Sequence, residues 1–274
     1  MIRCGRFLLP LDRPLIMGIV NLTPDSFSGD GLGGDARRAA EQARRQIEAG
    51  ADIVDLGAES TRPGAAPATA GEELERLLPA LDALADCPAP ISVDTYKPEV
   101  MRAALEHGAS MINDIQALRR PGALEAVAPG DCAVCLMHAR GDPPDMQRAP
   151  AYDDVVGEVR AFLAGRVEAA LAAGIARERL ILDPGFGFGK TPAHNFALLA
   201  HLEECACAGL PILAGLSRKS MLGAAAGRPV AERLAASVAA ALIAVQRGAS
   251  IVRVHDVAET RDALRVWQAV REAL

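Results

Sequence analysis

Short apolar runs alternate with amphipathic segments along almost the whole chain. The segments between the runs are rich in Ala, Leu, Arg and Glu, as in 35–50 and 230–248, and their apolar residues recur every three to four positions, which is typical of helices that pack on one face. The apolar runs cover residues 16–20, 52–56, 90–94, 111–115, 132–137, 180–183, 211–215 and 251–254. The pattern predicts a strand followed by a helix, eight times.

Continuous apolar strands joined by helical crossovers pair in parallel, and eight such units close into a (β/α)8 TIM barrel of the α/β class. Gly50, Gly108 and Gly248 each stand just before a strand, where glycine supplies the left-handed cap that ends a helix. A doubly wound open sheet is the alternative. We expect one domain over residues 1–274, with the first dozen residues forming a strand pair or cover at the barrel bottom.

A parallel barrel gathers its active site where strands end and the following loops begin, and polar residues stand at most of these positions. They are Asn21, Glu59 with Thr61 and Arg62, Asp94, Asn113 with Asp114, His138, Asp183, Ser217 with Arg218 and Lys219, and Arg253 with His255. Polar residues that merely cover a solvent-exposed surface would not be expected at most of the eight strand ends. The pattern indicates an active site.

Three of these groups suit a planar heterocycle. Asp94, Asn113 and Asp183 present two carboxyls and an amide, which complement a ring edge with adjacent N–H donors, as in aminopyrimidines. The alternative is structural acids satisfied by backbone amides and by Lys219. In 183–191, DPGFGFGKT, Pro184 rules out a phosphate-binding Walker loop. The glycines there could bring two aromatic rings close to a flat ligand, or the segment could be an ordinary turn.

The loops after the last two strands suit phosphate. Ser217-Arg218-Lys219-Ser220 together with Arg253 and His255 offers two guanidiniums, an ammonium and hydroxyls, in the region where such barrels often bind phosphate. A solvated basic turn is the alternative. The loops after the first two strands, 21–28 and 59–65, carry small polar residues with one Phe and one Arg, and could close over a substrate or be mobile surface turns.

Composition narrows the function classes. The 274-residue chain has a net charge of −6 and a pI near 5.5, which argues against binding to nucleic acid or to a membrane surface. The apolar N-terminal stretch is too short for a signal peptide, and 234–245 is too short to span a bilayer, so we expect the cytoplasm. No zinc motif and no nucleophile elbow occur, but Asn21 could serve Mg²⁺ together with substrate phosphates.

Eight segments in order carry a resemblance to a known family. They are IMGIVNLTPDSFS, DLGAESTRPGA, SVDTYKPEV, INDI, LMH, DPGFGFGKT, LAGLSRKSM and RVHDV. Together they resemble the dihydropteroate synthases, transferases of folate biosynthesis that are sulfonamide targets, and the resemblance runs from about Ile16 to Trp267. It implies a homodimeric barrel that uses Mg²⁺ and joins 6-hydroxymethyl-7,8-dihydropterin diphosphate to 4-aminobenzoate, giving 7,8-dihydropteroate and diphosphate.

The resemblance also implies a role for each matched residue. Asp94, Lys219, Arg253 and His255 would be catalytic. The pterin would be held by Asp94, Asn113, Asp183 and Lys219, the diphosphate by Asn21 through Mg²⁺ and by Thr61, Arg253 and His255, and the aminobenzoate by Phe27, Arg62, Pro63, Phe188, Lys219 and Ser220.

Two other functions stay open on this pattern. One is a methyltransferase of the same pterin-binding superfamily, which uses methyltetrahydrofolate and a corrinoid protein and has no diphosphate to bind. The other is a catalytically silent pterin-binding homologue, which would be expected to have lost some of Asn21, Thr61, Lys219 or Arg253; all four are present.

Overall fold

The computed structural model describes residues 1–23, 31–59, 67–141, 146 and 150–273. Eight parallel strands close into a barrel in the order β10-β3-β4-β5-β6-β7-β8-β9. Their bounds are β3 Leu15–Asn21, β4 Ile53–Gly57, β5 Ile91–Asp94, β6 Met111–Asp114, β7 Ala133–Met137, β8 Leu180–Asp183, β9 Ile212–Ala214 and β10 Ala249–Val254. Every predicted run overlaps one of these strands, so the predicted TIM barrel is confirmed and the open sheet is wrong.

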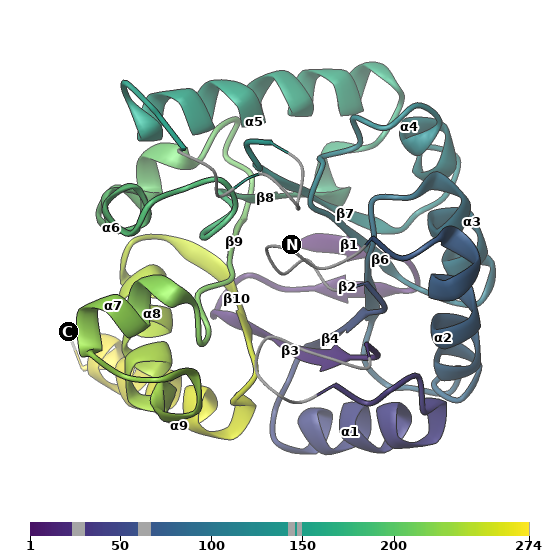
Figure 1. Cartoon of the computed structure of the whole chain (residues 1–274), viewed down its shortest axis with the longest axis horizontal. Coiled ribbons are helices and arrows are strands. Elements are labelled where there is room, and N and C mark those ends of the chain that lie inside the picture. The colour runs from purple at the N-terminus through teal and green to yellow at the C-terminus, as the bar shows by residue number, and fades with distance from the viewer. Residues whose placement is uncertain (24–30, 60–66, 142–145, 147–149, 274) are drawn as a thin grey trace.

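Helices surround the strands, as Figure 1 shows. Their bounds are α1 Ala36–Glu48, α2 Ala70–Asp82, α3 Pro98–Glu106, α4 Ala123–Val127, α5 Val155–Ala172, α6 Pro192–Ala200, α7 Ser220–Ala226, α8 Leu234–Gln246 and α9 Val257–Glu272. In the part of the chain that the structure describes, no helix has both the length and the apolar character that crossing a membrane requires.

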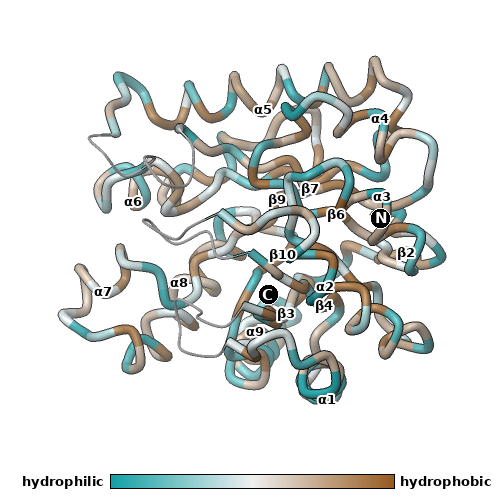
Figure 2. The backbone as a smooth tube through the Cα atoms, turned by 45° about the vertical axis from the view of Figure 1, so that its right-hand side comes forward, coloured by the Kyte–Doolittle hydropathy of each residue, from teal (hydrophilic) through white to brown (hydrophobic). Residues whose placement is uncertain are grey.

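Helix α1 is amphipathic, and its apolar face packs on the barrel. Hydrophilic colour dominates the outer helix α1 in Figure 2, yet its Ala39, Ala40 and Ala43 are buried in the main core between strands and helices. Asp35 begins this helix by accepting a hydrogen bond from the Arg38 N–H, and Thr69 with Glu72 forms a capping box on α2. Such caps stabilise a helix by about 1 kcal/mol each.

The predicted strand pair at the N-terminus is confirmed. Strands β1 (Ile2–Cys4) and β2 (Phe7–Leu9) form an antiparallel hairpin, which crosses the centre of the ring in the view of Figure 1. Its buried side chains Ile2, Cys4 and Leu9 pack against the lowest inward-facing layer of the barrel. The hairpin therefore closes the amino-terminal end of the barrel, and a ligand can approach only from the other end.

One carboxylate fastens the segment after this hairpin to the barrel. Asp52 accepts two hydrogen bonds from the Arg13 guanidinium, at 2.6 and 3.0 Å, one from the Ile16 N–H at 2.8 Å and one from Arg261 of α9 at 3.2 Å. Burial alone would raise the pKa of Asp52, but these partners together hold it below its usual value. The folded state therefore favours the carboxylate.

We predict that Asp52→Asn lowers the free energy of unfolding at pH 7 by about 2 to 4 kcal/mol, because it removes the charge of a largely buried carboxylate that pairs with both Arg13 and Arg261. Because the folded pKa is depressed, this contribution is present above the unfolded pKa of about 4 and is lost as pH falls through the folded pKa. Urea unfolding of both proteins at several pH values measures it. Asp86→Asn is the control, since that side chain is 85% exposed and its loss should cost less than about 0.5 kcal/mol. A deficit that stays constant down to pH 3 would contradict this explanation.

Candidate active site

Two layers of inward-facing side chains divide the barrel interior. The lower layer is apolar and includes Met17, Ile53, Met111, Ile181 and Ile251. Since side chains alternate along a strand, the residues two positions further on face inward at the next level, and there the polar ones gather. They are Asp55 of β4, Asp94 of β5, Asn113 of β6, Asp183 of β8 and Arg253 of β10.

Arg253 joins this polar layer across the barrel. Its Nε donates to Asp55 Oδ2 at 2.6 Å and its Nη2 donates to Asp94 Oδ2 at 3.0 Å. Although burial lowers the pKa of a guanidinium, the two carboxylates more than offset this effect and raise it. Asp55 was not predicted as a site residue. The available signal was an acid in the middle of the apolar run DIVDL, where no turn or helix cap accounts for it.

Asp55 also sets the orientation of the Asn113 amide. Asn113 Nδ2 donates to Asp55 Oδ2 at 3.1 Å, and only the nitrogen of an amide can face a carboxylate in this way. Asn113 Oδ1 is therefore turned away from Asp55. Among the residues that the structure describes, neither Asn113 Oδ1 nor Asp55 Oδ1 has a hydrogen-bond partner, and both are buried. Buried acceptors of this kind indicate a ligand or water that donates to them.

The two predicted acids lie in the same layer. Burial raises the pKa of Asp94 to about 7, with Arg253 offsetting part of the effect. Burial also raises the pKa of Asp183, and Lys219 opposes this. Asp183 Oδ1 accepts from the Gly185 N–H at 2.7 Å, which turns the chain into the glycine-rich loop.

Lys219 lies at the mouth, at the N-terminus of α7. Burial lowers the pKa of its ammonium to about 8, against the attraction of Asp183. The ammonium donates to the Phe186 carbonyl oxygen and lies 4.9 Å from the centre of the Phe188 ring. Phe188 is half-buried, whereas Phe186 is fully buried in the main core. Of the two aromatic residues considered for a flat ligand, only Phe188 is therefore placed at the mouth, and Ser220 is exposed just beyond Lys219.

Two contacts join the loops after β9 and β10. The His255 ring nitrogen Nδ1 lies 2.9 Å from Ser217 Oγ. The Arg218 guanidinium forms a two-point ion pair with Asp256, at 2.6 and 3.2 Å. Asp256, just before α9, therefore sets the orientation of the Arg218 guanidinium, and the expectation that Arg218 supplies charge to an anion stays a prediction.

Strand register places Asn21 near Asp94. Asn21 pairs with Gly57, Gly57 with Asp94, and Asp94 with Asn113, so these residues form one row of strand register across four strands. Gly57 has no side chain, and its Cα hydrogen faces both Asn21 Oδ1 and Asp94 Cβ. Within the described ranges no group of three or more His, Cys, Asp or Glu could hold a metal ion.

Four predicted site residues, Phe27, Thr61, Arg62 and Pro63, lie outside the residues that the structure describes.

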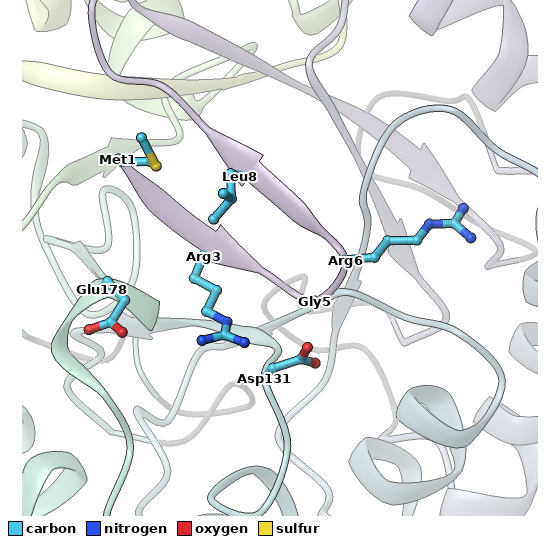
Figure 3. Close-up of a pocket in the computed structure, with 7 residues that line it drawn as sticks. All are labelled: Met1, Arg3, Gly5, Arg6, Leu8, Asp131 and Glu178. Atoms are coloured by element: carbon cyan, nitrogen blue, oxygen red, sulfur yellow. The ribbon is translucent and has the colours of Figure 1, made fainter.

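The pocket in Figure 3 is separate from the predicted site. It is lined by the N-terminal hairpin together with Asp131 and Glu178, which precede β7 and β8, so it lies at the barrel end opposite to the polar layer.

Comparisons with known proteins agree with this geometry. Residues 17–255 match the family described as pterin binding enzyme. Dihydropteroate synthase of Escherichia coli (strain K12) is 50% identical over 266 residues, which cover 97% of this chain and 94% of the relative.

Solved structures show the same fold. Burkholderia cenocepacia dihydropteroate synthase complexed with 7,8-dihydropteroate superposes with a TM-score of 0.92 at 54% identity, covering 99% of this chain and 96% of that one. The Yersinia pestis enzyme in a sulfonamide drug complex gives a TM-score of 0.95 at 47% identity over 100% of both chains. The chain belongs to the pterin-binding enzyme family, and within it to the dihydropteroate synthases.

Proposed function

We propose that this chain joins 6-hydroxymethyl-7,8-dihydropterin diphosphate to 4-aminobenzoate, releasing diphosphate and forming 7,8-dihydropteroate. One observation carries the proposal: a layer of buried hydrogen-bond acceptors, organised around Arg253, at the open end of a barrel whose other end is closed. Two relatives support it, since the Burkholderia cenocepacia enzyme is complexed with 7,8-dihydropteroate and a Xanthomonas albilineans enzyme at 53% identity was solved with 4-aminobenzoic acid.

The acceptors suit the pterin ring. Its aminopyrimidine edge presents adjacent N–H donors, and Asp94, Asn113 Oδ1 and Asp183 offer acceptors at the ends of β5, β6 and β8. Lys219 can donate to a ring oxygen or nitrogen beside Asp183. A hydrocarbon or a simple sugar would leave these buried acceptors without partners, which is costly.

The charge of the polar layer suits the chemistry of diphosphate departure. The Asp94 carboxylate lies at the edge of this layer that the pterin would occupy, and its negative charge can stabilise the positive charge that spreads over the pterin as the C–O bond to diphosphate breaks. The aniline nitrogen of aminobenzoate then attacks the methylene carbon and loses a proton. No enzyme nucleophile is needed, because the site supplies position and electrostatic stabilisation.

The leaving group would meet the loops after β9 and β10. Arg253 uses two of its five N–H donors on carboxylates and can direct others to diphosphate oxygens. His255 stands beside it at the mouth, and the resemblance adds Thr61. Asn21 fits a role for Mg²⁺ because it offers an amide oxygen near Asp94, and Mg²⁺ binds through few protein oxygens when phosphates complete its coordination. When bound, the ion would neutralise charge on the diphosphate.

Aminobenzoate would bind outside the pterin. Phe188 packs on an apolar cluster of Tyr96, Ile115, Met137 and Ala139, which gives a benzene ring one apolar wall. Lys219 and Ser220 lie on the neighbouring side. The roles of Phe27, Arg62 and Pro63 rest on the family resemblance.

The rival functions fit less well. A corrinoid-dependent methyltransferase has no diphosphate to bind, so the loops after β9 and β10 would have no leaving group to meet. A silent homologue would be expected to lack some of Asn21, Thr61, Lys219 and Arg253, which this chain retains.

We also propose a homodimer in the cytoplasm. Exposed apolar side chains on α8 and α9, namely Ile243, Val266 and Val270, are 42%, 67% and 60% exposed and would be covered by a second copy. All six cysteines are buried free thiols, the state that a reducing compartment maintains.

The direct test follows diphosphate and pterin products from the purified protein with Mg²⁺, with and without 4-aminobenzoate. The proposal predicts dihydropteroate in a one-to-one ratio with diphosphate, and loss of activity with a chelator that Mg²⁺ restores. Tight binding of the pterin substrate without any dihydropteroate would contradict it and favour the silent homologue.

We predict that Asp94→Asn lowers kcat about 100-fold, which corresponds to about 2.7 kcal/mol of transition-state stabilisation. The amide keeps the shape but removes the charge that offsets the pterin cation. Steady-state kinetics measure the change. Asp131→Asn, at the opposite end of the barrel, should keep wild-type kcat. Full turnover by Asp94→Asn would overturn the charge role.

We predict that kcat/KM for the pterin substrate is bell-shaped in pH. Below about pH 7 protonation of Asp94 removes an acceptor, and above about pH 8 Lys219 loses its charge. Lys219→Arg should move the alkaline limb upward by more than one pH unit, because a guanidinium stays protonated. Titration of the substrate diphosphate affects both proteins equally, so an unmoved alkaline limb in the variant would refute the assignment to Lys219.

A further inference from the structure

The glycine-rich loop between β8 and α6 wraps around a buried ammonium group that the proposed chemistry does not use. Lys190 is only 3% exposed. Its Nζ donates to the carbonyl oxygens of Gly185 at 2.8 Å and Phe188 at 3.1 Å, and it lies 2.9 Å from His138 Nδ1 at the end of β7. An ammonium has three N–H donors. The His138 carbonyl oxygen, at 3.4 Å, is a fourth acceptor, so each of the three protons has a partner.

His138 takes part as a neutral ring. Burial, followed by the nearby Lys190 charge, lowers the pKa of His138 to about 3. The neutral ring can accept at one nitrogen only, and the ammonium faces Nδ1, so Nε2 carries the proton. The Phe162 ring meets the imidazole edge-on at 4.9 Å between centres. His138 was expected at the active-site mouth, but its ring nitrogen serves Lys190.

The loop has little freedom to pack in another way. Gly185 and Gly189 have φ angles of 69° and 65°, a left-handed conformation that favours glycine. A side chain at Gly185 would overlap the His138 carbonyl oxygen, and one at Gly189 would overlap the Arg140 carbonyl oxygen. The backbone is therefore pressed against the loop after β7, with its carbonyl oxygens turned inward to the Lys190 ammonium.

The outer side of this loop forms part of the active site. The Phe186 carbonyl oxygen accepts from Lys219, and the Phe188 ring lies 4.9 Å from the same ammonium. Phe188 contacts both ammonium groups. Its carbonyl oxygen accepts a hydrogen bond from Lys190, and its ring faces Lys219. The position of the ring thus depends on where the Lys190 ammonium holds the backbone.

We propose that Lys190 is a positioning residue whose ammonium acts as an internal cation, gathering the carbonyl oxygens of Gly185 and Phe188 and so fixing Phe188 and Lys219 for the aromatic amine substrate. The inference rests on the proposed function, because it assigns Phe188 and Lys219 to aminobenzoate. Lys190 is assigned no proton-transfer step, since its Nζ is buried behind the loop and hydrogen-bonded to it. Burial lowers the pKa of Lys190 to about 7, and the charge of Asp183 opposes this effect.

The experiment compares Lys190→Ala, Lys190→Met and Phe188→Ala with the wild type, using steady-state kinetics for both substrates and hydrogen exchange of peptide 184–191. Lys190→Ala should raise KM for 4-aminobenzoate at least tenfold and change KM for the pterin substrate less than threefold. Exchange of the loop amides should become at least tenfold faster. A general loss of stability would instead affect both substrates.

Chemical rescue tests whether Lys190 acts through its charged N–H donors or only by filling space. Ethylammonium chloride should enter the cavity of Lys190→Ala and restore both KM for 4-aminobenzoate and the slow exchange. Tetramethylammonium chloride at the same ionic strength should not, because it has no N–H donors. Lys190→Met, which fills the cavity, and Phe188→Ala, which removes the ring, should show the raised KM without rescue.

Failure of the two proposals can be told apart. If the wild type forms no dihydropteroate, the proposed function fails, whereas loop exchange and its rescue still test the internal cation. If the wild type is active and Lys190→Ala keeps KM for 4-aminobenzoate, or if ethylammonium restores neither quantity, the positioning role is wrong. Should Lys190→Ala not fold, the same KM criterion applies to Lys190→Met.

Discussion

A single buried ion pair, between Arg253 and Asp55, organises the interior of this barrel. The cost of removing a guanidinium and a carboxylate from water is best offset when the two groups pair and accept or donate further hydrogen bonds. Asp55 Oδ2 binds Arg253 Nε at 2.6 Å and Asn113 Nδ2 at 3.1 Å, so one oxygen sets the position of a cation and the orientation of an amide. Asp94 Oδ2 accepts a second hydrogen bond from the Arg253 guanidinium, at 3.0 Å. The remaining acceptor atoms are left directed toward a ligand.

This arrangement depends on the two ends of the barrel being different. The apolar layer and the hairpin of β1 and β2 exclude water from below, which makes each charge above it interact more strongly. The same exclusion raises the pKa of Asp94 and lowers that of Lys219. A closed floor and a polar upper layer thus place titrating groups near neutral pH, where they serve catalysis best.

Much of the fold could be predicted from the sequence, because continuous apolar runs and helical spacing report directly on strands and helices in a parallel barrel. The strand-end rule also located Asp94, Asn113, Asp183 and Arg253 in one layer. The rule failed where a hydrogen-bond partner decides what a residue does. Asp55 stands in the middle of a strand, and the His138 ring accepts a hydrogen bond from Lys190. The pairing of Arg218 with Asp256 of the next loop was not predicted either. Such pairings join residues distant in sequence, and no local pattern encodes them.

The most direct test of this account is a double-mutant cycle on pterin affinity. Binding of a dihydropterin without diphosphate is measured by calorimetry for wild type, Asp55→Asn, Arg253→Met and the double variant. If Asp55 acts through Arg253, each single change leaves a buried partner unsatisfied, and the double variant loses much less affinity than the sum, with a coupling above about 1 kcal/mol. Additive losses, within about 0.5 kcal/mol, would contradict the central role of this pair.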